Sequence, residues 1–128
     1  MFATRAVRVF AYGSPVDMRK GFEGLSALVR LGMSQDPLSG DLYLFVNRHR
    51  KRAKVLLWDG TGLCLYAKRL ERGCFAALWK SAGGSASALS LTITELQLFL
   101  EGSALVGKMP LSPPPLSRKD LAIAVSTL

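Results

Sequence analysis

Three apolar runs of strand length follow one another in the middle of the chain, at residues 42–46, 53–58 and 63–70. Short polar breaks separate them, which predicts consecutive β-strands. The break at residues 59–62 is typical of a tight hairpin turn, because its two glycines accept the positive φ angles that such turns need. The break at residues 48–52 consists mainly of charged side chains. This part of the chain therefore predicts a three-stranded antiparallel meander.

A strand and a helix are predicted before the meander. Residues 7–12 are rich in β-branched and aromatic side chains, which favours a short strand. Ser14, Pro15 and Asp17 are then placed as in a helix N-terminus, with a capping serine, proline at the first position and an early acid. Apolar side chains recur beyond them at helical spacing, at Met18, Phe22, Leu25, Leu28 and Val29. The pattern predicts a helix over residues 15–31.

The C-terminal part of the chain has a weaker pattern. Residues 73–90 are mostly small and show no clear period. Thr92 and Glu95 then have the spacing of a capping box, which predicts a short helix over residues 93–101 that ends at Gly102. Four of the six prolines lie further on and exclude regular structure there.

Together these elements predict an α+β fold. We expect an antiparallel β-meander of three to four strands packed against an N-terminal helix, with a short C-terminal helix and a Pro-rich tail. The chain has 128 residues, of which 49% are hydrophobic and 20% charged, enough for one independent core. Residues 1–102 are the predicted domain, and residues 103–128 are expected to be a flexible tail.

The net charge of +8 is concentrated in one segment. Residues 48–72 contain eight basic and two acidic side chains, a local net charge of +6. In the predicted meander, the strand over residues 63–70 returns toward the loop over residues 48–52, so both basic clusters should meet at one end of the sheet. The candidate binding residues are Arg48, Arg50, Lys51, Arg52, Lys54, Lys68, Arg69 and Arg72.

Such a cluster fits a polyanion, above all the phosphate backbone of a nucleic acid. The alternative is that residues 48–52 only keep a hairpin tip solvated and protect a sheet edge. The sequence shows no recognition helix with base-reading side chains, so contacts to phosphate are favoured over contacts to bases.

Candidates for catalysis or metal binding are weak. His49 is the only histidine, and Arg48 and Arg50 beside it disfavour a metal ion. Cys64 lies in an apolar strand and is expected to be a small core residue. Cys74 follows a basic stretch, so it is either a reactive thiol or an incidental loop residue. Asp17, Asp36, Asp41 and Asp59 occupy cap and turn positions, where carboxylates commonly serve local hydrogen bonds. We therefore predict no catalytic residue, no metal site, no cofactor and no enzymatic activity.

Four motifs occur in order with family-like spacing, at residues 17–25, 35–40, 55–65 and 67–73. The first begins Asp17-Met18-Arg19-Lys20-Gly21, and the third contains Trp58-Asp59-Gly60-Thr61-Gly62. Together they resemble the TnpB accessory protein, the second open reading frame in insertion sequences of the IS sixty-six group. The resemblance covers about Arg5 to Gly102. It implies a small protein that supports transposition beside a larger transposase of the acidic-triad type, with no known cofactor or catalytic residue.

Two positions depart from the resemblance, since His49 and Cys74 stand where the family more often has arginine. We expect a non-enzymatic accessory protein of insertion-sequence transposition that binds the DNA backbone through the basic cluster. The alternative is an adaptor that docks on the transposase through the helix over residues 15–31 or the surface around Trp58 and Tyr66, which are expected to pack in the core or against each other.

The expected partners are DNA, at the ends of the element, and the transposase. A homo-oligomer is left open. With no apolar stretch long enough for a bilayer, we expect a cytoplasmic protein without membrane contact.

Overall fold

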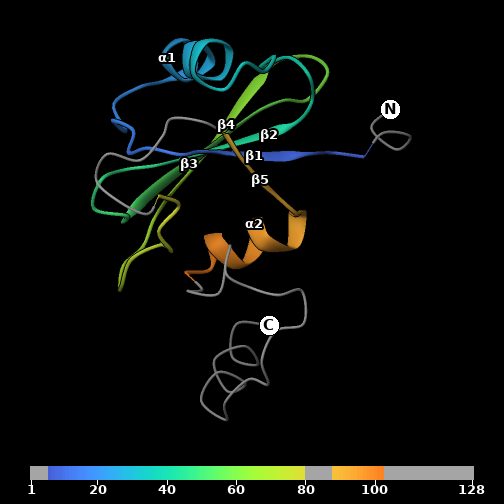
Figure 1. Ribbon diagram of the computed structural model, residues 1–128. Coiled ribbons are helices and arrows are strands. Elements are labelled where there is room, and N and C mark those ends of the chain that lie inside the picture. The colour runs from blue at the N-terminus through green and yellow to red at the C-terminus, as the bar shows by residue number, and fades with distance from the viewer. Residues whose placement is uncertain (1–5, 80–87, 103–128) are drawn as a thin grey trace.

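The computed structural model describes residues 6–79 and 88–102, which form a five-stranded sheet with helices on both faces. Figure 1 shows α1 above the sheet and α2 below it. A π-helical turn, η2, continues α1. The elements are β1 (Val9–Tyr12), α1 (Phe22–Ala27), η2 (Leu28–Gly32), β2 (Leu42–Val46), β3 (Arg52–Trp58), β4 (Leu63–Arg69), β5 (Ala88–Leu91) and α2 (Ile93–Leu100).

The sheet is mixed, with strand order β4-β3-β2-β1-β5. β2, β3 and β4 are antiparallel neighbours, as the apolar runs predicted, but β1 pairs with β2 in parallel and with β5 antiparallel. The predicted antiparallel meander of three to four strands is therefore wrong for the whole sheet, although the α+β class is confirmed. The physical reason is the α1 crossover between β1 and β2, because parallel neighbours need such a long connection.

The first helix begins at Phe22 and not at residue 15. Residues 15–21 form a loop, whose Val16 backbone N–H donates to the Val46 carbonyl at the end of β2 (2.9 Å). This bond fixes the loop to the end of β2, and the predicted helix N-terminus is wrong by about two turns. Consequently the loop, and not a helix, lies beside the end of β2 and β3.

The two faces of the sheet carry separate cores. The face toward α2 has stacked Phe75 and Phe99 rings, whose centroids are 4.9 Å apart. The face toward α1 packs Leu25 and Val29 against Phe45 of β2. Because side chains alternate along each strand, neighbouring residues serve different cores.

A buried carboxylate fixes the beginning of the β1–β2 pair. Asp41 is fully buried and forms an ion pair with Arg8 just before β1 (Nη2 to Oδ2, 2.9 Å). The Ser39 hydroxyl bonds Asp41 and also Tyr43, whose own hydroxyl donates to the Asp36 carbonyl (2.9 Å). Burial raises the pKa of the Tyr43 hydroxyl. A buried charge needs such partners, so this network fixes the start of β2 beside the start of β1.

Several local predictions are confirmed. Thr92 and Glu95 form a capping box at the start of α2, with N–H to oxygen distances of 3.0 and 2.9 Å. Gly102 follows α2 with a φ of +86°, a conformation that favours glycine at a helix end. The Asp59 carboxylate accepts bonds from the Thr61 and Gly62 backbones and closes the hairpin turn. The predicted tail over residues 103–128 lies outside the described residues.

Candidate nucleic-acid interface

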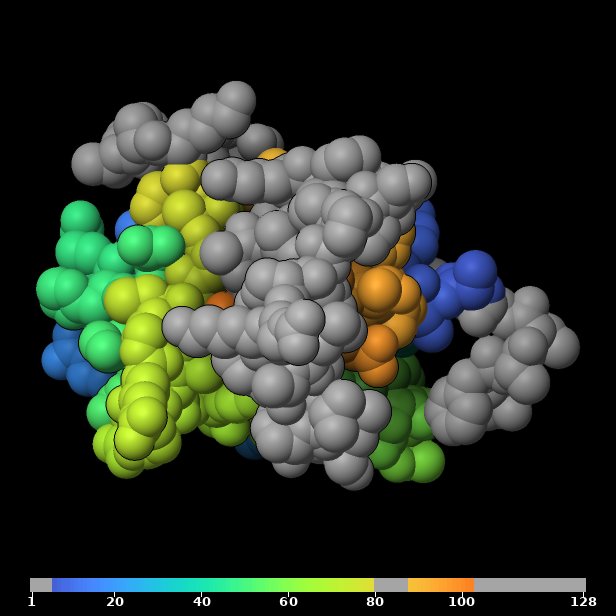
Figure 2. All heavy atoms as spheres, turned by 90° about the horizontal axis from the view of Figure 1, so that it is seen from below, coloured from blue at the N-terminus to red at the C-terminus, as the bar shows by residue number. Residues whose placement is uncertain are grey.

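The two basic segments lie side by side at one end of the β3–β4 hairpin, which we call the basic end. Arg52 of β3 is directly opposite Arg69 of β4 in the strand register. Beyond the strands, the Leu70 N–H donates to the Lys51 carbonyl (2.8 Å) and the Phe75 N–H donates to the Arg50 carbonyl (2.6 Å). In Figure 2 the green loop between β2 and β3 adjoins the yellow segment that follows β4.

The loop between β2 and β3 is shaped by Asn47, which the sequence reasoning did not single out. Its side-chain oxygen accepts the backbone N–H groups of Lys51 (3.0 Å) and Arg52 (3.1 Å), and its carbonyl accepts that of Arg50. Arg50 has a φ of +59°, an uncommon backbone conformation for a residue with a side chain. Asn47 therefore holds a strained turn that presents the basic side chains. An asparagine directly before a basic loop is the pattern that indicates it.

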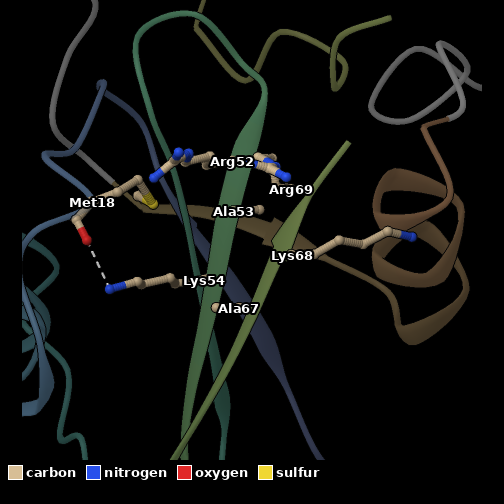
Figure 3. A pocket seen from close by; sticks show the side chains of 7 residues that line it. All are labelled: Met18, Arg52, Ala53, Lys54, Ala67, Lys68 and Arg69. Atoms are coloured by element: carbon tan, nitrogen blue, oxygen red, sulfur yellow. Dashed lines mark hydrogen bonds between the residues drawn. The ribbon is translucent and has the colours of Figure 1, made fainter. Parts of the chain in front are cut away.

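Strand alternation divides the basic residues between the two faces of the sheet. Arg52 and Lys54 point toward the face of α1, and so does Arg69, while Lys68 points toward α2 (Figure 3). The Lys68 ammonium donates to the Leu100 carbonyl at the end of α2 (2.6 Å). The Lys68 side chain is therefore turned away from the two arginines toward α2, although Lys68 still lines a hollow together with Arg52, Lys54 and Arg69.

Three of the eight cationic side chains are half-buried, and each one bonds to backbone carbonyl groups: Arg50, Lys54 and Lys68. The Lys54 ammonium donates to the carbonyls of Met18 (2.8 Å) and Lys20 (2.9 Å), and Figure 3 shows the first of these bonds. It thus fixes the loop over residues 15–21 to the sheet. These cations have structural roles, which limits their availability to a ligand.

The other five basic side chains are exposed: Arg48, Lys51, Arg52, Arg69 and Arg72. Lys51 donates to the Gly73 carbonyl (3.2 Å), and Arg69 lies 3.5 Å from Glu71, a pair in which both side chains are largely exposed. Such a surface ion pair stabilises a fold very little. Within the part of the chain that the structure describes, the side chain of Arg52 has no ion pair or hydrogen bond.

Arg52 and Arg69, which we call the arginine pair, are like charges opposite each other on one face. Like charges in directly opposite positions of a sheet are destabilising. An anion between two guanidinium groups removes that repulsion and accepts several N–H bonds at once. The geometry thus suits a phosphate group or another oxyanion.

Two hollows flank Arg52 and share its side chain and that of Met18. The first has a volume of about 390 Å³ and lies along β3 and β4, where the arginine pair, Lys54 and Lys68 line it. The second, of about 440 Å³, is lined by Arg19, Arg48 and other residues of the two loops. We call these two neighbouring hollows together the basic channel, because they share Arg52 and Met18.

Arg19 reaches this channel only because residues 15–21 are not helical, so the sequence reasoning missed it. It pairs with Asp17, an acid among the lining residues (Nη2 to Oδ2, 2.6 Å). The hydrogen bonds from the Arg19 side chain and backbone lower the pKa of Asp17 to about 2. The Asp17 carboxylate is therefore ionised at neutral pH, and the guanidinium group of Arg19 compensates its charge.

The two cysteines lie in different environments. Cys64 is half-buried, and its thiol donates to Asp59 (3.4 Å), a bond that raises the pKa of Cys64 and disfavours the reactive thiolate. Cys74 is exposed. Over residues 6–79 and 88–102, no cluster of three metal-binding side chains occurs, and no helix is long and apolar enough to cross a membrane.

The predicted contact between Trp58 and Tyr66 is wrong. Tyr66 lies opposite Val55 and is 49% exposed, while Trp58 lies opposite Leu63. Tyr66 is three residues from Leu63, and only residues an even number of positions apart on a strand point to the same face. Trp58 and Tyr66 therefore lie on different faces of the hairpin.

Comparisons with known proteins identify the family. The family described as "IS66 Orf2 like protein" matches residues 7–108. Two proteins of Sinorhizobium fredii (strain NBRC 101917 / NGR234) are similar to this chain. "Uncharacterized protein y4hO" is 43% identical over 84 residues, which cover 66% of this chain and 71% of that protein. "Uncharacterized protein y4jC" is 39% identical over 72 residues. The second match covers 56% of this chain and 62%, less than two thirds, of the relative. No solved structure matches at a significant level. The chain belongs to the IS66 Orf2-like family and is an insertion-sequence accessory protein, in a family that is not known for enzymes.

Proposed function

We propose that this accessory protein binds the phosphate backbone of DNA during transposition, through the basic channel and without catalysing a reaction. The arginine pair is the observation that supports this function. Arg52 and Arg69 face each other on an exposed surface, and Arg52 has no acidic partner among the described residues. Guanidinium groups bind phosphate oxygens in a bidentate manner, which fits this placement.

The channel favours contacts to the backbone over contacts to bases. Its cations come from strands and loops, and α1 is a six-residue helix packed on the sheet. Neither described α-helix presents a row of arginine, asparagine or glutamine for a major groove. We therefore expect binding that falls steeply with salt and depends weakly on sequence.

Fluorescence anisotropy with a labelled duplex tests this function. Arg52→Glu and Arg69→Glu should each weaken binding about tenfold or more at low salt, because a phosphate contact is replaced by repulsion. Arg30→Glu is the matched control, since Arg30 is exposed on η2 and does not line the channel. Absence of binding by the wild type at about 50 mM salt, or an equal loss in all three variants, contradicts the proposal.

A second candidate function is docking on the transposase. α1 and η2 expose Phe22 (46%) and Leu31 (85%), and apolar side chains at such exposure favour contact with protein. Co-purification with the transposase, with and without nuclease, tests it. An association that survives nuclease and is lost in Leu31→Glu supports direct docking, whereas one lost after nuclease treatment indicates bridging by DNA.

A further inference from the structure

β4 is an edge strand of the sheet formed by the described residues. It has seven residues, Leu63–Arg69, and contains neither proline nor glycine. Edge strands present unpaired N–H and C=O groups, and proteins usually protect them with charges, prolines or bulges. In β4 the only charged residues are Lys68 and Arg69, at its last two positions. The remaining edge is neutral and able to pair with another strand.

The centre of β4 is exposed on both faces of the sheet. Tyr66, the middle residue, is 49% exposed, and Ala67 beside it is also exposed. Tyr66 lies on the face of α2 and Ala67 on the face of α1. An incoming strand would cover side chains on both faces, so the exposure agrees with a missing neighbour in the sheet.

We propose that β4 pairs with β4 of a second copy of this chain, antiparallel and centred on Tyr66, to form a continuous ten-stranded sheet. Full overlap of the two seven-residue strands requires this centre. It places Leu63 opposite Arg69 of the second copy and Cys64 opposite Lys68 of the second copy. Each hydrogen-bonding edge then satisfies the other.

Charge selects the antiparallel direction. A parallel pair would set Lys68 and Arg69 against the same residues of the second copy, and opposed like charges are destabilising. In the antiparallel pair the basic ends lie apart. Lys68 of one copy then lies opposite Cys64 of the other, whose thiol is 3.4 Å from the Asp59 carboxylate. The Lys68 ammonium keeps its bond to the Leu100 carbonyl of its own chain, and the two-fold axis brings opposite charges near each other at two equivalent places.

The same symmetry determines where the DNA-binding surfaces lie. The two-fold axis of an antiparallel pair is perpendicular to the sheet, so both arginine pairs face the same side. Because Arg69 is opposite Leu63 of the second copy, the two Arg69 residues are six positions apart, or about 20 Å along the strand. A single DNA segment can therefore contact both copies. The dimer itself does not depend on DNA binding.

A disulfide bond tests the register. In a Cys74→Ser background, Lys68→Cys places a thiol opposite the native Cys64 of the second copy. Within one chain these positions are four residues apart on one strand, about 13 Å, and cannot be bridged. We expect mild oxidation to produce a covalent dimer on a non-reducing gel. Ala67→Cys is the control, since position 67 points to the other face and should stay monomeric. Equal cross-linking of both variants, or of neither, contradicts the register.

The mass in solution tests the dimer without relying on cysteine. Light scattering of the nuclease-treated wild type should give twice the chain mass of 13.9 kDa. The dimer fraction should rise at high salt, which screens the net charge of +8. Tyr66→Lys places two lysines opposite each other at the centre and should give 13.9 kDa. Leu31→Lys adds the same charge at an exposed site away from β4 and should stay dimeric. A wild type that is monomeric over a full dilution series, or a dimer that Tyr66→Lys leaves intact, overturns the proposal.

Discussion

The two faces of the β3–β4 hairpin differ at its basic end. On the face of α2, Lys68 is half-buried and bonded to the last turn of α2, above a core closed by Phe75 and Phe99. On the face of α1, Arg52 and Arg69 are exposed beside a hollow. The contrast shows that the basic residues of one sequence cluster fall into two groups, one that supports the fold and one that remains available to an anion.

The origin of the difference is a helix that starts late. α2 lies across its face at this end of the sheet, whereas α1 begins at Phe22 and leaves the loop over residues 15–21 beside β3. Met18 and Arg19 of this loop line the channel. The binding surface therefore depends on local loop structure as much as on the number of arginines.

The largest expected effect is on the closed face. Phe99→Ala removes a fully buried ring that stacks on Phe75 and should lower the free energy of unfolding by about 3–5 kcal/mol, because it leaves a cavity. Urea denaturation measures this change. Leu31→Ala, at a site 85% exposed, should change the same quantity by less than about 0.5 kcal/mol. Similar losses in both variants would contradict the assigned core.

Lys54 sharpens the comparison on the open face. Lys54→Met keeps the aliphatic stem but leaves the carbonyls of Met18 and Lys20 without their donor, so we expect a loss of about 1–3 kcal/mol in unfolding free energy. Arg52→Met, the matched control on the same strand, should change it by less than about 0.5 kcal/mol or raise it, since it relieves the repulsion with Arg69. A larger loss for Arg52→Met would indicate that Arg52 has a structural role.

The salt dependence of DNA binding compares the two faces directly. Arg52→Gln and Arg69→Gln should each make the slope of log K against log salt less steep by about 1, because one phosphate contact is lost. Lys68→Gln should change the slope less than either arginine variant, since Lys68 lines the first hollow but its ammonium is already bonded to the Leu100 carbonyl. The measurement is a salt titration of a labelled duplex. Equal slopes for all three variants and the wild type would exclude the channel as the binding surface.

The smallest effect concerns the turn at the far end of the hairpin. Hydrogen bonds from the Thr61 and Gly62 backbones lower the pKa of Asp59 from 3.8 to about 2. A lowered pKa in the folded state means that the carboxylate stabilises the fold above about pH 4, and that this contribution is lost as the pH falls toward 2. Wild type should therefore melt at a higher temperature than Asp59→Asn at pH 6, with the difference vanishing near pH 2. A difference independent of pH would show that charge plays no part.

Much of the strand arrangement could be predicted from the sequence. The apolar run over residues 42–46 matches β2, and the runs over residues 53–58 and 63–70 match β3 and β4 within one residue. Local hydrogen bonding made the turn at Asp59 and the cap at Thr92 predictable, because both depend on residues near in sequence. The meeting of the two basic segments followed from strand direction alone.

Long-range competition explains what the sequence did not show. Residues around Pro15 have a helix-like pattern, but the bond from Val16 to Val46 and the bonds from Lys54 hold them in a loop. β5 has only four residues and exists because β1 offers it an edge. Strand alternation assigns Lys68 to the opposite face, and this could have been predicted once Arg52 was placed opposite Arg69.

β1 lies between β2, the next strand in the sequence, and β5, near the end of the described chain, and this order affects how the protein folds. Val9 pairs with Leu42 on one side and with Leu91 on the other. The sheet is therefore incomplete until residues 88–91 have been synthesised, and contacts across such long separations slow folding. A nascent chain that ends before β5 would expose the edge of β1 and leave the core around Phe99 unfilled, so the protein should reach its native state only after most of the polypeptide has left the ribosome.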